Sequence, residues 1–308
     1  MTTSGTYVYS RTGAQIITEA LQLIGVYAAD ESTSSSDSTT CLATLNMMIK
    51  AWQGEGIGLW TKRDAALFLE YDETEYLIGP TGDNATSSWV KTEIATAADK
   101  TDSTITVDDD EDISDGDYIG IKLDDGTLQW TTVDGDPAAN VITLDDALTD
   151  DSAVDSHVYA YTTKLARPIE IADVMLRDAS GNERPIRIKS RQEYMALPNK
   201  EDRGSINIVH YNPLLTDGKL YTWQACNDVH EYLKFTAKIP IENFDATSDT
   251  PDFPQEWLLA LSWNLAVNIA PKFGRLLNNV FELRAQAYKQ AIADFDREDN
   301  SIFISVGR

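Results

Sequence analysis

The chain has 308 residues, 42% of them apolar, which is enough for about two domains with hydrophobic cores. It carries 25 Lys and Arg against 50 Asp and Glu, a formal net charge of −25 at neutral pH. So acidic a chain will not hold nucleic acid by neutralising phosphates, and its two cysteines are too few for a disulfide framework.

Two amphipathic helices are predicted near the start. Apolar residues recur at three- and four-residue steps from Thr12 to Val26, with Gly25 placed to stop the helix. The polar segment 32–40 is expected to be a loop that supplies helix caps. The same periodicity returns from Cys41 to Trp52, and glycines follow it. One face of each helix must be covered by other parts of the chain.

The period changes to that of strands after residue 66, where Leu67 and Leu69 alternate with Phe68 and Glu70. The predicted strands are 103–107, 117–123, 128–133, 140–144, 157–163, 169–177, 185–189, 206–211, 219–223 and 232–238. The pair Asp125-Gly126 favours a tight hairpin turn. The segment from Asp99 to Asp155 holds eighteen of the acidic residues and only two lysines. We therefore expect a mostly antiparallel, partly very acidic β-rich domain.

A short helix is predicted inside this region, because Ser190 and Glu193 form a capping-box pattern and Pro198 closes the turn. Long helices return near the end of the chain. One begins at 252–254 and ends at Pro271, and another is predicted from Gly274 to Arg297. The apolar residues of this last helix are Leu276, Leu277, Val280, Leu283, Ala287, Ala291, Ile292 and Phe295.

The predicted fold class is α+β, with a helical platform of about four α-helices from both ends of the chain and a large, mostly antiparallel β-rich inserted domain. The expected domains are 1–65 and 246–299 for the two halves of the platform, 66–245 for the insertion, and 300–308 for an extended C-terminal tail. Platform helices are expected to pack through Leu45, Met48, Trp52, Trp257, Leu261 and Leu265.

The C-terminal tail places several large apolar residues beyond the last predicted helix. In an extended strand, Ile302, Ile304 and Val306 would share one face and Phe303 would lie on the other. Such a segment can pair with the sheet edge of a partner or fill grooves on it. The alternative is that it docks on its own domain.

No catalytic motif is present. His157, His210 and His230 form no zinc-protease pattern, and the chain has neither a nucleophile elbow nor a phosphate-binding loop. Cys41 and Cys226 are expected to be reduced and buried. The chain is therefore predicted to be no enzyme and to need no cofactor. No apolar run approaches the roughly 18 residues of a membrane span, and residues 1–10 lack the layout of a secretory signal, so neither a membrane nor export is expected.

Calcium is weakly indicated by Asp108, Asp110 and Asp112, because carboxylates at alternate positions can chelate a hard cation. However, the calcium-loop pattern requires glycine at its sixth position, which here is Ile113. An acidic strand edge that blocks aggregation is the favoured interpretation. No metal site is therefore predicted.

Two separated stretches of the sequence carry a family resemblance. The first is EALQLIGVYAADES with CLATLNMMIKAWQGEGIGLW, residues 19–32 and 41–60. The second is DFPQEWLLALSWNLAVNIAPKFG, residues 252–274. Together, and in this order along the chain, they resemble the head-to-tail adaptor family of short-tailed bacteriophages, also called tail accessory or head-completion proteins. The positions that carry the resemblance are Leu23, Gly25, Val26, Leu45, Met48, Trp52, Trp257, Asn264, Leu265, Ala266, Ile269, Ala270 and Pro271.

The resemblance implies a structural virion protein at the portal–tail junction, assembled in the host cytoplasm. It implies a ring of identical subunits, usually a dodecamer, that docks on the portal protein, meets the tail nozzle and fibre proteins, and helps to retain packaged DNA without sequence-specific DNA binding. It also implies that the tail with Ile302, Phe303, Ile304 and Val306 binds the portal. The shortest members of the family resemble only the helical platform, and similarity to longer members with comparable insertions suggests that the β insertion is an outward module beside the tail fibre or nozzle proteins.

Two other functions stay open. A carbohydrate-binding or fibre-attachment tail module would use exposed strand aromatics, although strand aromatics more often belong to a core. The candidates are Trp89, Trp130, Tyr159, Tyr161, Tyr211 and Trp223. A glycan-degrading tail enzyme would need two carboxylates at close range, and so acidic a sequence makes any one pair uninformative.

Overall fold

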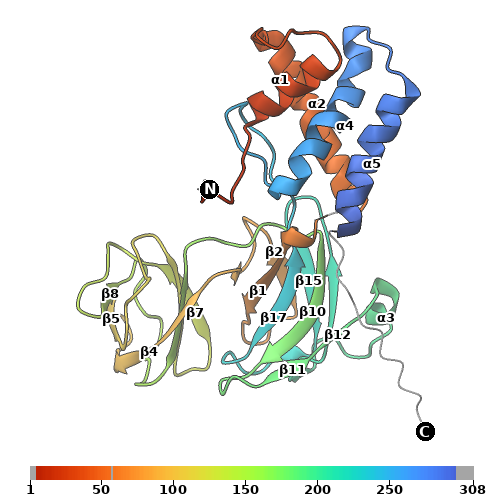
Figure 1. Ribbon diagram of the computed structural model, residues 1–308. Coiled ribbons are helices and arrows are strands. Elements are labelled where there is room, and N and C mark those ends of the chain that lie inside the picture. The colour runs from red at the N-terminus through yellow and green to blue at the C-terminus, as the bar shows by residue number, and fades with distance from the viewer. Residues whose placement is uncertain (1–4, 57, 296–308) are drawn as a thin grey trace. The chain divides into compact units, whose positions relative to one another are not determined.

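The computed structural model describes residues 5–56 and 58–295 (Figure 1). The chain forms two compact units: a helical unit, made by the residues up to Thr61 together with those from Ile241 onward, and a β unit, Lys62–Pro240. The fold class is α+β, as predicted. The expected domain boundaries after residues 65 and 245 fall a few residues later than the divisions in the structure.

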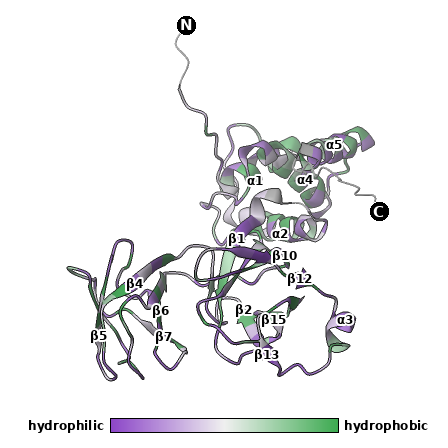
Figure 2. Ribbon diagram, turned by 90° about the horizontal axis from the view of Figure 1, so that it is seen from below, coloured by the Kyte–Doolittle hydropathy of each residue, from purple (hydrophilic) through white to green (hydrophobic). Residues whose placement is uncertain are grey.

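The helical unit contains α1 (Gly13–Leu23), α2 (Ser35–Gly54), α4 (Leu258–Ile269) and α5 (Asn279–Phe295). Helix α4 contacts each of the other three, so helices from both ends of the chain lie side by side (Figure 1). Figure 2 shows that hydrophobic and hydrophilic residues are interspersed along these helices. None of the described helices is long and apolar enough to cross a membrane.

Helix α2 begins earlier than predicted, because part of the polar segment 32–40 is helical. The Ser34 hydroxyl accepts a hydrogen bond from the Asp37 backbone N–H and caps the helix, and Asp37 adds a favourable negative charge to the first turn. The hydroxyls of Thr39 and Thr40 donate to carbonyls one turn earlier. The helix that the apolar residues of 41–52 predict therefore extends toward its N-terminus into a segment rich in serine and threonine.

One hydrophobic core joins the two sequence blocks of the helical unit. The six predicted packing residues Leu45, Met48, Trp52, Trp257, Leu261 and Leu265 all belong to it and are at most 6% exposed. The rings of Trp52 and Trp257 lie 5.8 Å apart between centroids. Asn46 also exchanges two hydrogen bonds with the Phe244 backbone, which attaches the returning chain to α2.

The β unit contains a sandwich of two sheets, with strand orders β11-β10-β17-β1-β3 and β12-β14-β15-β2. Its strands are β1 (Lys62–Phe68), β2 (Glu75–Ile78), β3 (Ala85–Thr86), β10 (Glu170–Arg177), β11 (Glu183–Pro185), β12 (Arg187–Ile188), β14 (Ile208–Asn212), β15 (Gly218–Trp223) and β17 (Tyr232–Lys238). The predicted strand 185–189 is divided, because β11 pairs with β10 in one sheet and β12 with β14 in the other.

A second sheet system, here called the acidic module, has the strand order β7-β6-β9-β4-β5-β8 and a core of its own. Its strands are β4 (Val90–Thr96), β5 (Thr104–Val107), β6 (Tyr118–Lys122), β7 (Leu128–Thr132), β8 (Val141–Thr143) and β9 (His157–Tyr161). The predicted Asp125-Gly126 turn joins β6 to β7, with Gly126 at φ +87°. Pairing is mostly antiparallel as predicted, but β12–β14 and the short pair β13 (Arg203–Gly204) and β16 (Ala225–Cys226) are parallel.

The second half of strand β1, residues 65–68, is buried on both faces rather than on one. Leu67 and Leu69 lie in the core of the sandwich, whereas Phe68 points into an aromatic cluster that also contains Tyr159 and Tyr161 of the acidic module. The Phe68 and Tyr159 ring centroids are 4.6 Å apart. This cluster attaches the acidic module to the sandwich within the β unit.

Candidate functional site

Helix α5 has two apolar faces. Phe281, Tyr288 and Ile292 pack against the core of the helical unit, and Phe281 stacks on Trp263 of α4 with a centroid distance of 4.6 Å. The other face is exposed: Val280 is 57% and Leu283 63% exposed. The apolar series predicted for this helix therefore belongs to two different surfaces.

The exposed face continues on both sides of Leu283. Leu276, which precedes the helix, is fully exposed, and Ala287 follows Leu283 after one turn. We call Leu276, Val280, Leu283 and Ala287 the α5 stripe. Steps of three and four residues place the helical members along one side of α5. Large apolar side chains gathered on a surface are typical of a site that a protein partner covers.

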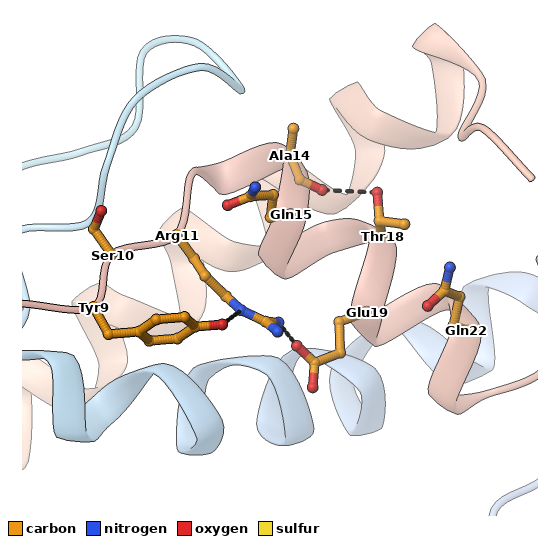
Figure 3. A pocket seen from close by; sticks show the side chains of 8 residues that line it. All are labelled: Tyr9, Ser10, Arg11, Ala14, Gln15, Thr18, Glu19 and Gln22. Carbon is orange, nitrogen blue, oxygen red and sulfur yellow. Dashed lines mark hydrogen bonds and ion pairs between the residues drawn. The ribbon is translucent and has the colours of Figure 1, made fainter. Parts of the chain in front are cut away.

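The segment before α1 presents further exposed apolar groups. Tyr7 is 89% and Val8 80% exposed, while the Tyr9 backbone N–H donates to the side chain of Gln255. An open pocket of about 580 Å³ lies beside this segment. In it, Arg11 donates to the Tyr9 hydroxyl at 2.7 Å and pairs with Glu19, as the side chains in Figure 3 illustrate. The charges in this pocket neutralise each other, so it offers no ionic group to a ligand.

The predicted portal-binding residues Ile302, Phe303, Ile304 and Val306 lie outside the described residues. Their role stays a prediction from the sequence.

The candidate calcium ligands are used as hydrogen-bond acceptors in loops. The Asp110 carboxylate accepts from the Asn140 backbone N–H at 2.9 Å, and the Asp108 carbonyl accepts from the Asn140 side chain at 2.9 Å. Asp112 occupies a left-handed turn at φ +63°. Among residues 5–56 and 58–295, no group of three or more His, Cys, Asp or Glu side chains is close enough to hold a metal ion.

The strand aromatics proposed for sugar binding are mostly used in packing. Tyr159 and Tyr161 are at most 3% exposed, which removes them from any open platform. Trp89 and Trp130 pack against the same aromatic cluster. The Tyr211 hydroxyl donates to the Pro168 carbonyl, and the Trp223 indole donates to the carbonyls of Pro198 and Asn199.

The two cysteines are free and buried, as predicted. Burial raises the pKa of Cys41 to about 11 and that of Cys226 to about 12. At neutral pH both groups are therefore thiols, which are poor nucleophiles and poor metal ligands.

Two histidines meet where the acidic module joins the sandwich. The His157 and His230 ring centroids are 5.0 Å apart, the Asp228 carboxylate accepts from His230 at 2.8 Å, and Glu93 lies 3.5 Å from His157. Burial is the main cause that lowers the pKa of His157, and the positive charge of Lys91 and the nearness of His230 lower it further. His157 is thus held neutral at the junction.

Acidification is therefore expected to destabilise the β unit. The unfolded chain binds a proton at His157 near the ordinary value of 6.5, but the folded chain does so only at lower pH. Below pH 6.5 the unfolded state therefore binds more protons than the folded state. The free energy of unfolding consequently decreases as the pH is lowered. Urea unfolding between about pH 7.5 and pH 5.5 should show this slope, and His157→Gln should flatten it. His210→Gln, away from the junction, is the control; an unchanged slope in His157→Gln would contradict the assignment.

A further pocket, here called the pocket beside α3 (Arg191–Met195), lies in the β unit and has a volume of about 440 Å³. None of the residues that line it was singled out for function from the sequence. Its aromatic side chains are Tyr194 of α3, His210 of β14 and Tyr221 of β15. Helix α3 was predicted, and the capping box between Ser190 and Glu193 is present in the structure. His210 and Tyr221 occupy outward-facing positions of β14 and β15, and the alternation of side chains along these two strands could have indicated both residues.

Compared with known proteins, the chain matches no protein-family model and no curated sequence at a significant level.

Proposed function

We propose that the chain is a structural subunit of a ring-shaped head-to-tail adaptor that docks on a phage portal, connects it to the tail nozzle and fibre proteins, and helps to retain packaged DNA. The ring is proposed to be dodecameric and to act at the portal–tail junction of the virion after assembly in the host cytoplasm. Its work is ordered assembly and sealing rather than catalysis.

The observation that carries this proposal is the shared core of the helical unit. The family resemblance rests on two blocks at opposite ends of the chain, and it requires that they fold together. Trp52 from the first block and Trp257 from the second are each at most 4% exposed in one cluster. Had the blocks packed in separate bodies, the resemblance would have lost its structural meaning.

The α5 stripe is proposed as a contact between neighbouring copies. A closed ring with a single rotation axis needs a heterologous interface, in which one surface of a subunit meets a different surface of the next. Leu276, Val280 and Leu283 supply one apolar side of such a contact. Each buried leucine contributes about 1.5–3 kcal/mol.

Ring assembly should consequently be sensitive to Leu283→Asp. Loss of one buried leucine at about 1.5–3 kcal/mol corresponds to roughly a 10- to 100-fold higher concentration for half-maximal assembly, and a buried charge adds to that. Native mass measurement of the purified chain, with and without a portal ring, would give the subunit count. Leu215→Asp, at a 94% exposed leucine of the β unit, is the matched control. Wild-type assembly by Leu283→Asp would rule out the stripe as a subunit contact.

A carbohydrate-binding role is the second candidate. The buried aromatics disfavour the residues first considered for it, but the pocket beside α3 provides a different set.

A further inference from the structure

The pocket beside α3 lies on the outer face of the four-stranded sheet. His210 faces Tyr221 across β14 and β15, and Tyr221 faces Glu75 across β15 and β2. Their chain neighbours Val209 and Leu220 are fully buried in the sandwich core. Because side chains alternate along a strand, His210 and Tyr221 project to the opposite face of the sheet.

Three rings form the aromatic part of the pocket. The centroids of Tyr194, His210 and Tyr221 are 5.5, 5.8 and 6.0 Å apart, and the interplanar angles are 44°, 19° and 28°. Tyr194 is only 4% exposed, whereas His210 and Tyr221 are partly exposed, so these two rings supply the aromatic surface that a ligand can reach. The Tyr194 hydroxyl donates to the Thr222 carbonyl, which ties α3 to the sheet and holds this arrangement.

Several polar groups of the pocket are available to a ligand. The His210 Nδ1 lies 3.0 Å from the Lys189 carbonyl, which can only accept, so Nδ1 carries the proton and a neutral ring leaves Nε2 as an acceptor. Within the part of the chain that the structure describes, no protein partner is present for the Asn212 amide, the Tyr221 hydroxyl or the Arg191 guanidinium. The pocket thus combines donors and acceptors with apolar ring surface.

The pocket is also locally positive in a chain whose net charge is −25. Glu75 pairs with Lys219, and Glu193 outside the pocket pairs with Lys189, so these charges cancel. The Lys200 ammonium donates to the Met195 and Leu197 carbonyls and lies 5.5 Å from the Tyr194 ring centroid, with no carboxylate paired to it in the described chain. Lys200 and Arg191 therefore remain as two uncompensated cations.

We infer that this pocket binds a sugar ring that carries a carboxylate, as in a uronic acid unit of an acidic polysaccharide. The C–H groups of the sugar would contact Tyr221 and His210, and its hydroxyls would meet the Asn212 amide, the Tyr221 hydroxyl and His210 Nε2. The carboxylate would take the planar fork of Arg191, which suits bidentate binding. A pocket of about 440 Å³ has room for one such ring with part of a neighbour. The inference does not depend on the proposed adaptor role.

The test uses the full chain and saturation-transfer NMR with titration. The probes are methyl β-D-glucuronide, methyl β-D-glucoside and free glutamate, which separate sugar ring from carboxylate. The glucuronide is expected to bind at least about tenfold more tightly than either other probe. Equal affinity for the glucoside would overturn the role of the carboxylate. Equal affinity for glutamate would overturn the sugar assignment, and the absence of saturation transfer from the protein to any of the three probes would overturn the site.

Variants assign the binding to these residues. Arg191→Gln should reduce glucuronide affinity to that of the glucoside, whereas Arg187→Gln, at an exposed arginine on neighbouring β12, should leave it unchanged. Tyr221→Ala should abolish binding of both sugars. Asn212→Ala, at a partly exposed edge of the pocket, should weaken both even if the Tyr221 variant fails to fold. Wild-type affinity in Arg191→Gln, or equal losses in both arginine variants, would refute the assigned contact.

Discussion

Leu261→Ala is expected to lower the free energy of unfolding of the helical unit by about 3–5 kcal/mol, among the largest effects of any single truncation in this chain. Leu261 is fully buried in α4, and the core around it is built from both ends of the sequence. Removal of its side chain costs the transfer free energy of the lost carbons and also leaves a cavity. Hydrogen exchange of the α4 amides, followed peptide by peptide, would measure the loss in this unit separately.

A matched control lies two residues earlier in the same helix. Leu259 is 47% exposed. Leu259→Ala therefore removes the same atoms and changes the intrinsic helix propensity by nearly the same amount as Leu261→Ala, but it leaves no buried cavity. Its cost should stay within about 0.5 kcal/mol. The amides of β17 in the β unit should exchange as in the wild type for both variants. Equal losses for the two leucines would show that the shared core does not hold the helical unit together.

The local patterns of the sequence were sufficient to predict the helices of the helical unit, although α2 begins at Ser35 rather than at Cys41, and α5 begins at Asn279 rather than at Gly274. Apolar spacing predicted α1 and α2, and Trp257, Leu261 and Leu265 were expected to face a core. The capping boxes at Thr12 and Ser190 are local hydrogen-bond patterns, which is why short-range sequence reasoning can find such helix starts.

Tertiary contacts decided what the sequence could not predict. Strand β4 was not predicted, although Val90, Thr92 and Ile94 alternate with Lys91 and Glu93; its partners β5 and β9 lie on separate stretches of chain. The apolar residues of α5 form one continuous series in the sequence. In the structure, however, Ala285 is buried against α4, whereas Leu283 is exposed. Periodicity reports apolar positions, but it does not report which of two faces is covered within the same chain.

The pocket beside α3 was not predicted from the sequence for a related reason. Its rings come from a helix and two strands, and the register between β14 and β15 brings His210 opposite Tyr221. A pair across two strands is not visible in the order of residues along the chain. The aromatics that were singled out instead, such as Tyr159 and Tyr161, satisfy the same strand pattern but face a buried cluster.

Truncation after residue 299 is expected to leave both units folded and to abolish binding to the portal ring. Residues 300–308 lie outside the described structure, so their sequence alone carries this expectation. Burial of Ile302, Phe303, Ile304 and Val306 on a partner would contribute about 1.5–3 kcal/mol for each side chain, or of order 6–12 kcal/mol before the cost of ordering the segment. Such a loss is large enough to shift a nanomolar complex beyond the micromolar range.

Full-length variants separate apolar recognition from chain length. Replacing Ile302, Ile304 and Val306 together with serine should reproduce the truncation, because an extended segment presents these three side chains on one face. Replacing Ser301 and Ser305 together with threonine preserves the length and all the large apolar groups, and it should bind like the wild type. Analytical ultracentrifugation with a portal ring would read out all four proteins. If the truncated chain still sediments with the portal, the attachment must come from elsewhere, and the exposed Leu276, Val280 and Leu283 of the helical unit become the next surface to change.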